Sequence, residues 1–357
     1  MEFGLSEQQV LLQDSVHRYL TDQVPLDRVR RIAAGDESDA GIWAELTELG
    51  IPALLIPEHL GGVGLGLLDA VVVAEVLGRH VTPGPFSTTA VMAALVLMDI
   101  GLEDELAAIA TGELRIGIAF TEAIGARVDA GVSINSGADG DTLSGKCLFA
   151  LDGYADRYLV ATGDKAIYLV RADANGVTRN NLTTVDKTRG TCELVFERAQ
   201  ARKVSNDPAV FERALDAGRL MQAADTLGAA QAMLDQAVHY SLQREQFNRV
   251  IGSFQAVKHL CADMAANLEP CRSLVWYAGH AMDAVPEEAS LLACHAKAHL
   301  SEVGQAVAKT ATEVHGGMGF TDLLGLHYWF KRIGANRQLL GSPELVREHA
   351  ARVQGLI

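Results

Sequence analysis

The feature that most constrains the fold is a change of pattern that occurs twice along the chain. Up to about residue 115, apolar residues recur at spacings typical of helices that bury one face. Short apolar runs separated by turn sequences then follow, as antiparallel strands would be. Alanine- and leucine-rich segments with helical spacing return after Pro208. The sequence therefore predicts an α+β protein with an N-terminal helical domain (1–115), a small middle β domain (116–205) and a C-terminal helical bundle domain (206–357).

Capping residues mark some of the helix ends. Ser6 with Gln9 three residues later has the spacing of an N-terminal capping box. Gly50 ends the next apolar stripe, and Gly78 follows the apolar segment 67–77 where a C-terminal cap is expected. We therefore expect one helix to begin after Ser6 and another to end at Gly78.

Composition excludes several classes of protein. Hydrophobic residues make up 49% and charged residues 21% of the 357, which is a globular balance and excludes a disordered chain. The net charge of −15 disfavours nucleic acid and anionic membranes as partners. The amino terminus lacks the pattern of a secretory signal, and the longest apolar stretch, 61–78, is interrupted by Asp69 and Glu75.

The thiols and imidazoles do not form a recognisable metal-binding pattern. Eleven histidines show no HExxH spacing, and the charges Glu45, Glu212 and Asp225 have the pattern of ordinary helix charges. The five scattered cysteines contain no CxxC pair; they are Cys147, Cys192, Cys261, Cys271 and Cys294. We therefore expect reduced, buried thiols, no metal site and a cytoplasmic protein.

Three segments in order resemble the acyl-CoA dehydrogenase family, and the resemblance covers nearly the whole chain. The segment WAELTELGIPALLIPEHLGGVGLGLLDAVVVAEVLGR is similar to the first helical domain of that family. REQFNRVIGSFQAVKH (244–259) resembles its flavin-contacting pattern, and EVHGGMGFT (313–321) resembles its glycine turn. The resemblance implies the acyl-CoA dehydrogenase fold, with a C-terminal four-helix bundle, and FAD-dependent α,β-desaturation of an acyl-CoA thioester.

The resemblance also assigns residues to the cofactor. Arg244 and Phe247 would share a face if they lay on a helix, and Gln255 would return to nearly that direction three turns later. In the family, residues so placed hold the pyrophosphate and adenosine half of a FAD that sits mainly on a neighbouring subunit. The implied cofactor-binding set is Arg244, Phe247, Gln255, Glu313, Gly316 and Gly317. Asn248 stands where the family favours glycine, and Glu313 where glutamine is common.

The family pattern fails at the catalytic base, the carboxylate that removes the substrate α-proton. One usual base position follows the glycine turn by about twenty residues, and here it holds Leu340. The other lies 26 residues before Arg244, and here it holds Gly218, next to the matching Arg219. Neither residue can accept a proton, so we assign no catalytic residue.

The segments that face the flavin ring in the family depart from its pattern too. TEAIGARVDA keeps only Thr121 and Glu122 of the family loop. Phe149, Ala150 and Leu151 stand where the family has an aromatic residue followed by a hydroxyl near the flavin. Leucine offers no side-chain hydrogen bond, so the ring contacts are absent along with the base.

Three interpretations follow. In the first, the chain is the base-lacking subunit of an α₂β₂ acyl-CoA dehydrogenase of the actinobacterial steroid type, and it completes the FAD site of a catalytic partner that binds the acyl-CoA and passes electrons to an acceptor. In the second, it is a self-sufficient dehydrogenase with a relocated base, for which Glu122 and Glu344 are the candidates. In the third, it is a flavin-free binding or scaffold protein.

Overall fold

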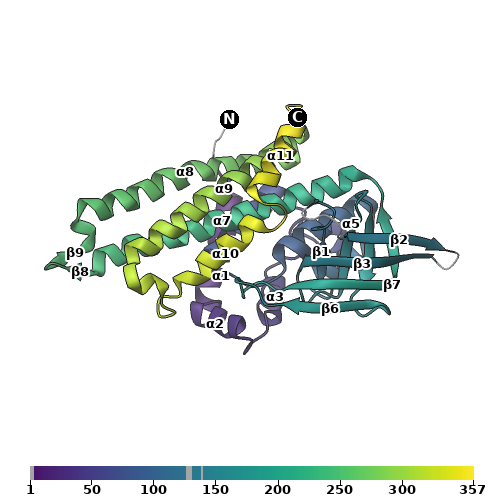
Figure 1. The fold of residues 1–357 in the computed structure, drawn as a ribbon, viewed down its shortest axis with the longest axis horizontal. Coiled ribbons are helices and arrows are strands. Elements are labelled where there is room, and N and C mark those ends of the chain that lie inside the picture. Colours follow the sequence, from purple (N-terminus) through teal and green to yellow (C-terminus); the bar gives the residue numbers. More distant parts are fainter. Residues whose placement is uncertain (1–3, 126–130, 138–139) are drawn as a thin grey trace.

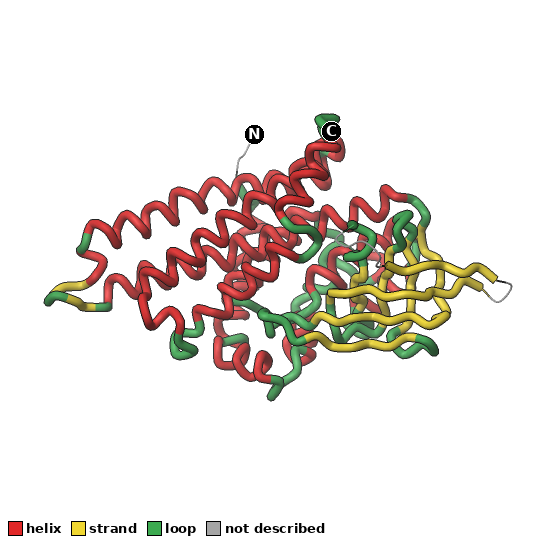
Figure 2. Tube along the Cα trace, in the orientation of Figure 1, coloured by secondary structure: helices red, strands yellow, loops and turns green. Residues whose placement is uncertain are grey.

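A computed structural model describes residues 4–125, 131–137 and 140–357. Long helices occupy one end of an elongated molecule and strands occupy the other (Figure 1), and Figure 2 shows the same division by secondary structure. Residues 126–130, the second half of the TEAIGARVDA segment, lie outside the described residues. Within the described ranges, no helix is both long and apolar enough to cross a membrane.

The N-terminal section is helical, as predicted, and Ser6 and Gln9 form the expected capping box. Its helices are α1 (Glu7–Gln23), α2 (Leu26–Ala34), α3 (Ala40–Glu48), α4 (Leu67–Arg79), α5 (Ala94–Ile100) and α6 (Glu103–Ala110), with a short 3₁₀ turn η1 (Glu58–Leu60) and a π-helical segment η2 (Phe86–Ala93).

The strands form one seven-stranded sheet, in the order β2-β3-β1-β4-β5-β7-β6. A further pairing between β3 and β7 closes five of them into a barrel. The prediction of antiparallel strands is wrong for one pair, because β1 and β4 run parallel. The strands are β1 (Ile116–Ala119), β2 (Gly131–Gly137), β3 (Gly140–Leu151), β4 (Arg157–Ala161), β5 (Ile167–Arg171), β6 (Val177–Leu182) and β7 (Thr191–Ser205).

The C-terminal section is a helical bundle in which α7 and α9 pack against each other, and α8 and α10 each pack against both of them. The Asp207 side chain caps α7 by accepting from the Ala209 amide, with Pro208 as the first helical residue. Its helices are α7 (Pro208–Gln243), α8 (Gln255–Ala284), α9 (Pro286–His315), α10 (Leu326–Gln338) and α11 (Pro343–Val353), with 3₁₀ turns η3 (Ile251–Ser253) and η4 (Gly316–Phe320).

Glycines let α4 and α7 approach closely. The prediction that Gly78 caps a helix is wrong, because α4 continues through it and buries it. A Cβ on Gly78 would lie 2.0 Å from the carbonyl oxygen of Asp225, and one on Gly228 would lie 1.8 Å from the carbonyl oxygen of Glu75. Larger residues at either position would force the two helices apart.

Hydrophobic cores continue across the predicted domain boundaries. One core joins the N-terminal helices to the bundle, and a second joins η2, the strand residues that face the helices and the start of α7, whereas a third lies among the strands alone. The domain boundaries at 115/116 and 205/206 therefore remain a prediction.

Candidate active site

The two predicted base positions lie against each other in the interior. A Cβ on Gly218 would lie 2.5 Å from Met92 Sδ and 2.7 Å from Leu340 Cδ1. Met92 and Leu340 are themselves only 0% and 3% exposed. The space that a carboxylate at 218 would need is therefore already filled by apolar atoms.

Arg219 holds the Leu340 segment in place. It is buried, its Nε donates to the Leu340 carbonyl oxygen at 3.2 Å, and its Nη1 donates to Asp216 Oδ1 at 3.2 Å. Leu340 has a φ of 58°, a left-handed conformation that non-glycine residues rarely adopt. Burial raises the pKa of Asp216 to about 6, although the Arg219 guanidinium opposes this.

One group of potential metal ligands occurs among the described residues. Single ligand atoms of Asp216, Cys294 and His349 all lie within 4.8 Å of one another. However, Arg219 Nη1 donates to Asp216 and also lies 3.7 Å from Cys294 Sγ. Burial raises the pKa of Cys294 to about 12, so its thiol keeps its proton at neutral pH. A guanidinium already supplies the positive charge here, and the arrangement does not suit a cation.

A cavity of about 560 Å³, the inner cavity, lies where the barrel meets α10 and the residues after it. Its wall is mostly apolar, with Phe149 at the barrel side. Phe149 lies at a β-bulge of β3 with a φ of 54° and is 43% exposed. The cavity is lined by Thr121, Ile124, Phe149, Thr184, Val185, Asp186, Arg189, Thr191, Gly334, Ala335, Gln338, Leu339, Leu340, Gly341, Ser342 and Leu345.

The two candidate relocated bases are not among the residues that line this cavity. Glu122 is buried, and its Oε1 accepts from the Leu148 amide at 3.1 Å. Glu344 lies in the first turn of α11, is 67% exposed and accepts from Arg337 at 3.4 Å. Hydrogen bonding from Ser342 lowers the pKa of Glu344, which makes it a weaker base.

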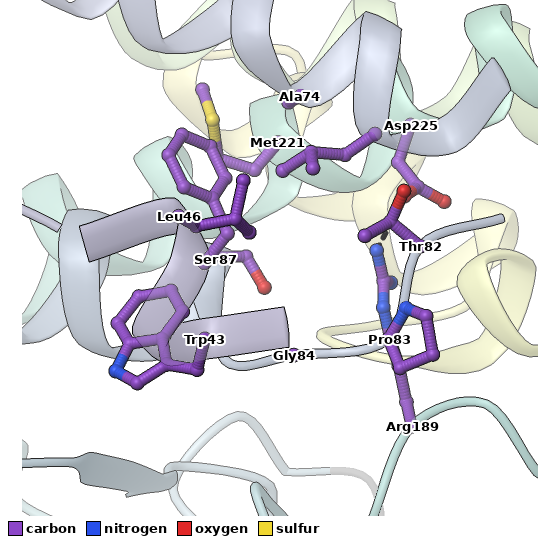
Figure 3. A pocket seen from close by; sticks show the side chains of 12 residues that line it. Trp43, Leu46, Ala74, Thr82, Pro83, Gly84, Ser87, Arg189, Met221 and Asp225 are labelled. Atoms are coloured by element: carbon purple, nitrogen blue, oxygen red, sulfur yellow. Dashed lines mark hydrogen bonds and ion pairs between the residues drawn. The ribbon is translucent and has the colours of Figure 1, made fainter. Parts of the chain in front are cut away.

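Two further cavities between the N-terminal helices, the barrel and α7 are very small. One, shown in Figure 3, has a volume of about 10 Å³ and lies between Trp43, Met221 and Arg189. The other has a volume of about 30 Å³ and is lined by Thr88 and Leu151, among others. Such volumes hold at most a water or two, so neither can take an acyl chain.

A buried ionic network next to these cavities was missed by the sequence analysis. Arg332, which is 0% exposed, donates to Asp186 at 2.8 Å and to Asp225 at 3.1 Å. Arg189 also donates to Asp225, at 2.5 Å. Burial raises and the Arg332 guanidinium lowers the pKa of Asp186, and the net effect is a pKa below its ordinary value. The interpretation of Asp225 as an ordinary helix charge is therefore wrong.

The predicted cofactor residues Arg244, Phe247 and Gln255 do not lie on one helix, so that expectation is wrong. Arg244 is the C-terminal cap of α7, and Gln255 is the first residue of α8. Between them, β8 (Glu245–Gln246) and β9 (Arg249–Val250) form a hairpin. Phe247 and Asn248 are its two-residue loop, with φ values of 53° and 58°, as a type I′ turn requires.

The other predicted cofactor residues lie at the end of α9. Gly316 caps this helix with a φ of 58°, and a Cβ on Gly316 or Gly317 would meet no atom within 4 Å. Glu313 is exposed on the last turn. The backbone is therefore open to close approach by a ligand.

The hairpin and the glycine turn belong to the same end of the bundle. The Tyr240 and His315 rings stack at 4.7 Å, which joins the last turn of α7 to the last turn of α9. The hairpin lies at the end of the molecule opposite the barrel (Figure 1). Large apolar side chains are exposed here, including Leu242 (63%), Phe247 (86%), Phe320 (80%) and Leu323 (74%). We refer to the two segments 242–255 and 313–323 as the distal end.

Comparisons with known proteins identify the relatives of this chain. The family models for the acyl-CoA dehydrogenase N-terminal and C-terminal domains match residues 6–108 and 209–355. The chain is 30% identical to acyl-CoA dehydrogenase IpdE2 of Mycolicibacterium smegmatis, over 98% of this chain and 99% of that protein. It is 33% identical to IpdE2 of Mycobacterium tuberculosis, over 95% of each chain.

Among solved structures, the chain is similar to a variant of the steroid acyl-CoA dehydrogenase Tcur3481–Tcur3483. The TM-score is 0.88 at 28% identity, with 98% of each chain covered. Both terminal sections match family models, and the whole-length relatives carry the family name. The chain is a member of the acyl-CoA dehydrogenase family.

Proposed function

We propose that this chain is the base-lacking subunit of a heteromeric, FAD-dependent acyl-CoA dehydrogenase. In an α₂β₂ assembly it completes the FAD site of a catalytic partner, which binds the acyl-CoA and supplies the base. The chain alone is inactive. The proposal rests on one observation: at the two base positions, Gly218 and Leu340 lie next to each other in a closed interior, and Met92 and Leu340 leave no room for a carboxylate at position 218.

The distal end carries groups that suit a dinucleotide. The Arg244 side chain is exposed and can pair with a pyrophosphate. Gly316 and Gly317 allow the close approach of a flat or extended ligand, since nothing lies within 4 Å of their added Cβ positions. When bound, FAD supplies the hydride acceptor of the desaturation. Because the distal end lies opposite the barrel, its residues serve a site on another chain, not the inner cavity of their own.

The two-protein composition and the substrate class follow by analogy. The similar structure Tcur3481–Tcur3483 bears two protein names and is called a steroid dehydrogenase. We therefore propose a steroid side-chain CoA ester as the substrate class of the assembly, with the partner as the subunit that contacts it.

The first test is the FAD content of the purified chain, measured by visible absorption, alone and after co-expression with candidate partner subunits. The proposal expects little FAD alone and FAD with turnover in the complex. One FAD per protomer with turnover by the homomeric chain would overturn it. In that case the Glu122→Gln and Glu344→Gln variants identify the base, as in the alternative of a self-sufficient enzyme.

The second test is the Arg244→Ala variant in the complex. FAD occupancy should fall by roughly tenfold or more, because a charge-assisted contact to the pyrophosphate is lost. The matched control is Arg352→Ala, which removes an exposed arginine from α11. Unchanged FAD occupancy in the Arg244→Ala complex would favour the flavin-free scaffold and contradict the proposal.

A further inference from the structure

A buried lysine joins two helices of the bundle. Lys297 lies on α9 and is only 1% exposed. Its Nζ donates to the backbone carbonyl oxygen of Asn336, which lies in the last turn of α10. The last carbonyl groups of a helix have no donor within the helix, so the lysine supplies one from outside. Lys297 therefore fastens the end of α10 to α9.

The charges that act on Lys297 are all positive. Among the described residues they are Arg219 of α7 and Arg337 of α10, and no carboxylate and no group of α8 or α11 acts on it. The Asn336 carbonyl and the C-terminal end of α10 favour a cation. Burial nevertheless outweighs them and, with the two arginines, lowers the pKa of Lys297 to about 7.

The carboxylates on the surrounding helices are paired with the two arginines. Asp216 of α7 lies 3.2 Å from Arg219. Glu302 of α9 and Glu344 of α11 lie 3.3 Å and 3.4 Å from Arg337. A proton on the lysine would therefore create a buried ammonium group without a counter-ion, which is costly. Two further titratable groups, Cys294 of α9 and His349 of α11, lie beside Asp216.

The end of α10 leads directly into a wall of the inner cavity. Residues 338–342 follow Asn336 closely, and all of them line that cavity. Arg219 donates to the Leu340 carbonyl oxygen, so this stretch of backbone is held by Lys297 from α9 and by Arg219 from α7. Of these two side chains, only the lysine can lose its proton, because a guanidinium stays charged in proteins.

We propose that Lys297 is a proton-controlled latch, which as a neutral amine fastens the end of α10 to α9. When it takes up a proton, the end of α10 and residues 338–342 separate from α9, and the ammonium group reaches water. A fall in pH through the neutral range therefore loosens one wall of the inner cavity. The inference goes beyond the proposed subunit role, and it does not depend on that role because one chain forms the whole latch.

The direction of the pH effect follows from proton binding. In the open form Lys297 is in water, where its ordinary pKa is 10.5, so it keeps its proton up to that pH. In the closed form it loses the proton above about pH 7. Between these two values, opening takes up one proton. The equilibrium constant for opening should therefore fall about tenfold when the pH rises from 8 to 9.

The experiment measures amide hydrogen exchange of the full chain at pH 8 and pH 9, corrected for the intrinsic exchange rate. The opening constant of residues 330–342 should fall about tenfold in the unaltered chain. Lys297→Met should remove this fall, because methionine takes up no proton. Lys258→Met, at an exposed position on α8, is the matched control and should retain it.

A second variant keeps the test decisive if Lys297→Met does not fold. Lys297→Gln retains a neutral donor and should also show no change between pH 8 and pH 9. A tenfold fall that persists in either variant, or an unaltered chain without pH dependence, would overturn the proposal. The same fall in the amides of α1 would also overturn it, because the whole chain would then respond. Amide exchange of the isolated chain is measured without FAD, so its outcome is separate from that of the proposed function.

Discussion

The interior around Gly218 and the distal end of the bundle are built in opposite ways. In the interior, Met92 and Leu340 fill the place of a base, and buried ion pairs hold the barrel against the bundle. At the distal end, a hairpin places Phe247 in solvent with 86% of its surface exposed. Side chains in the first region contact their own chain, and those in the second contact very little of it.

This difference distinguishes the residues that stabilise the fold from those that bind a partner or ligand. A closely packed interior stabilises the fold, and substitutions there have a large effect on the free energy of unfolding. Exposed groups such as Phe247 contribute little to stability, so their presence indicates a partner or ligand. We therefore expect interior substitutions to lower stability, and distal substitutions to change binding alone.

The largest effect should follow from Arg332→Ala. Removing this guanidinium leaves Asp186 buried without its charge partner, and we expect a loss of about 3–5 kcal/mol in the free energy of unfolding. Urea unfolding measures it. Arg352→Ala, at an exposed ion pair on α11, should change stability by less than about 0.5 kcal/mol. Similar losses in both variants would remove the contrast between buried and exposed charges.

Acid should weaken a partly buried contact next. His80 Nε2 lies 2.9 Å from His17 Nδ1, and burial lowers the pKa of His80 to about 4. The folded chain therefore binds this proton less readily than the unfolded chain does. The stability that neutral His80 contributes is full above pH 6.5 and is lost as the pH falls toward 4, by up to about 3 kcal/mol.

Unfolding measured between pH 4 and 7 tests this expectation. His80→Gln should flatten the pH dependence over that range. His239→Gln, at an exposed position on α7, should leave it as in the unaltered chain. Equal slopes for all three proteins would show that His80 does not carry the effect.

A pair of helical glycines gives a matched comparison of intermediate size. Gly218→Ala forces a Cβ into Met92 and Leu340, and should cost about 1–3 kcal/mol. Gly334→Ala meets open space and should instead stabilise α10 by up to about 1 kcal/mol, because alanine is the better helix former. Thermal unfolding should move in opposite directions, and a gain in stability from Gly218→Ala would show that the interior is not filled.

The smallest effect on stability should come from the distal hairpin. Phe247→Asn replaces an aromatic residue at a φ of 53° with one that tolerates this conformation, so stability should rise by about 0.5 kcal/mol or stay level. FAD occupancy of a complex should nevertheless fall. A loss of stability above about 1 kcal/mol would mean that the Phe247 ring is part of the core.

Local sequence rules predicted much of the fold and only part of the site. Ser6 with Gln9, and the strand runs of β1, β4, β5 and β7, follow from short-range spacing. The hairpin between Arg244 and Gln255 was missed, because Phe-Asn lacks the glycine that usually announces a type I′ turn. Gly78 was misread because the backbone it lets approach belongs to a helix almost 150 residues away.

By itself, the sequence determined the α+β organisation, the family resemblance and the identity of the residues at the two base positions. Only the tertiary structure decided that Gly218 and Leu340 contact each other, that Asp225 joins a buried ionic network, and that the cofactor residues lie opposite the barrel. The reason is physical. Spacing along the chain specifies local conformation, whereas contacts between distant segments depend on how whole elements pack, which no single spacing encodes.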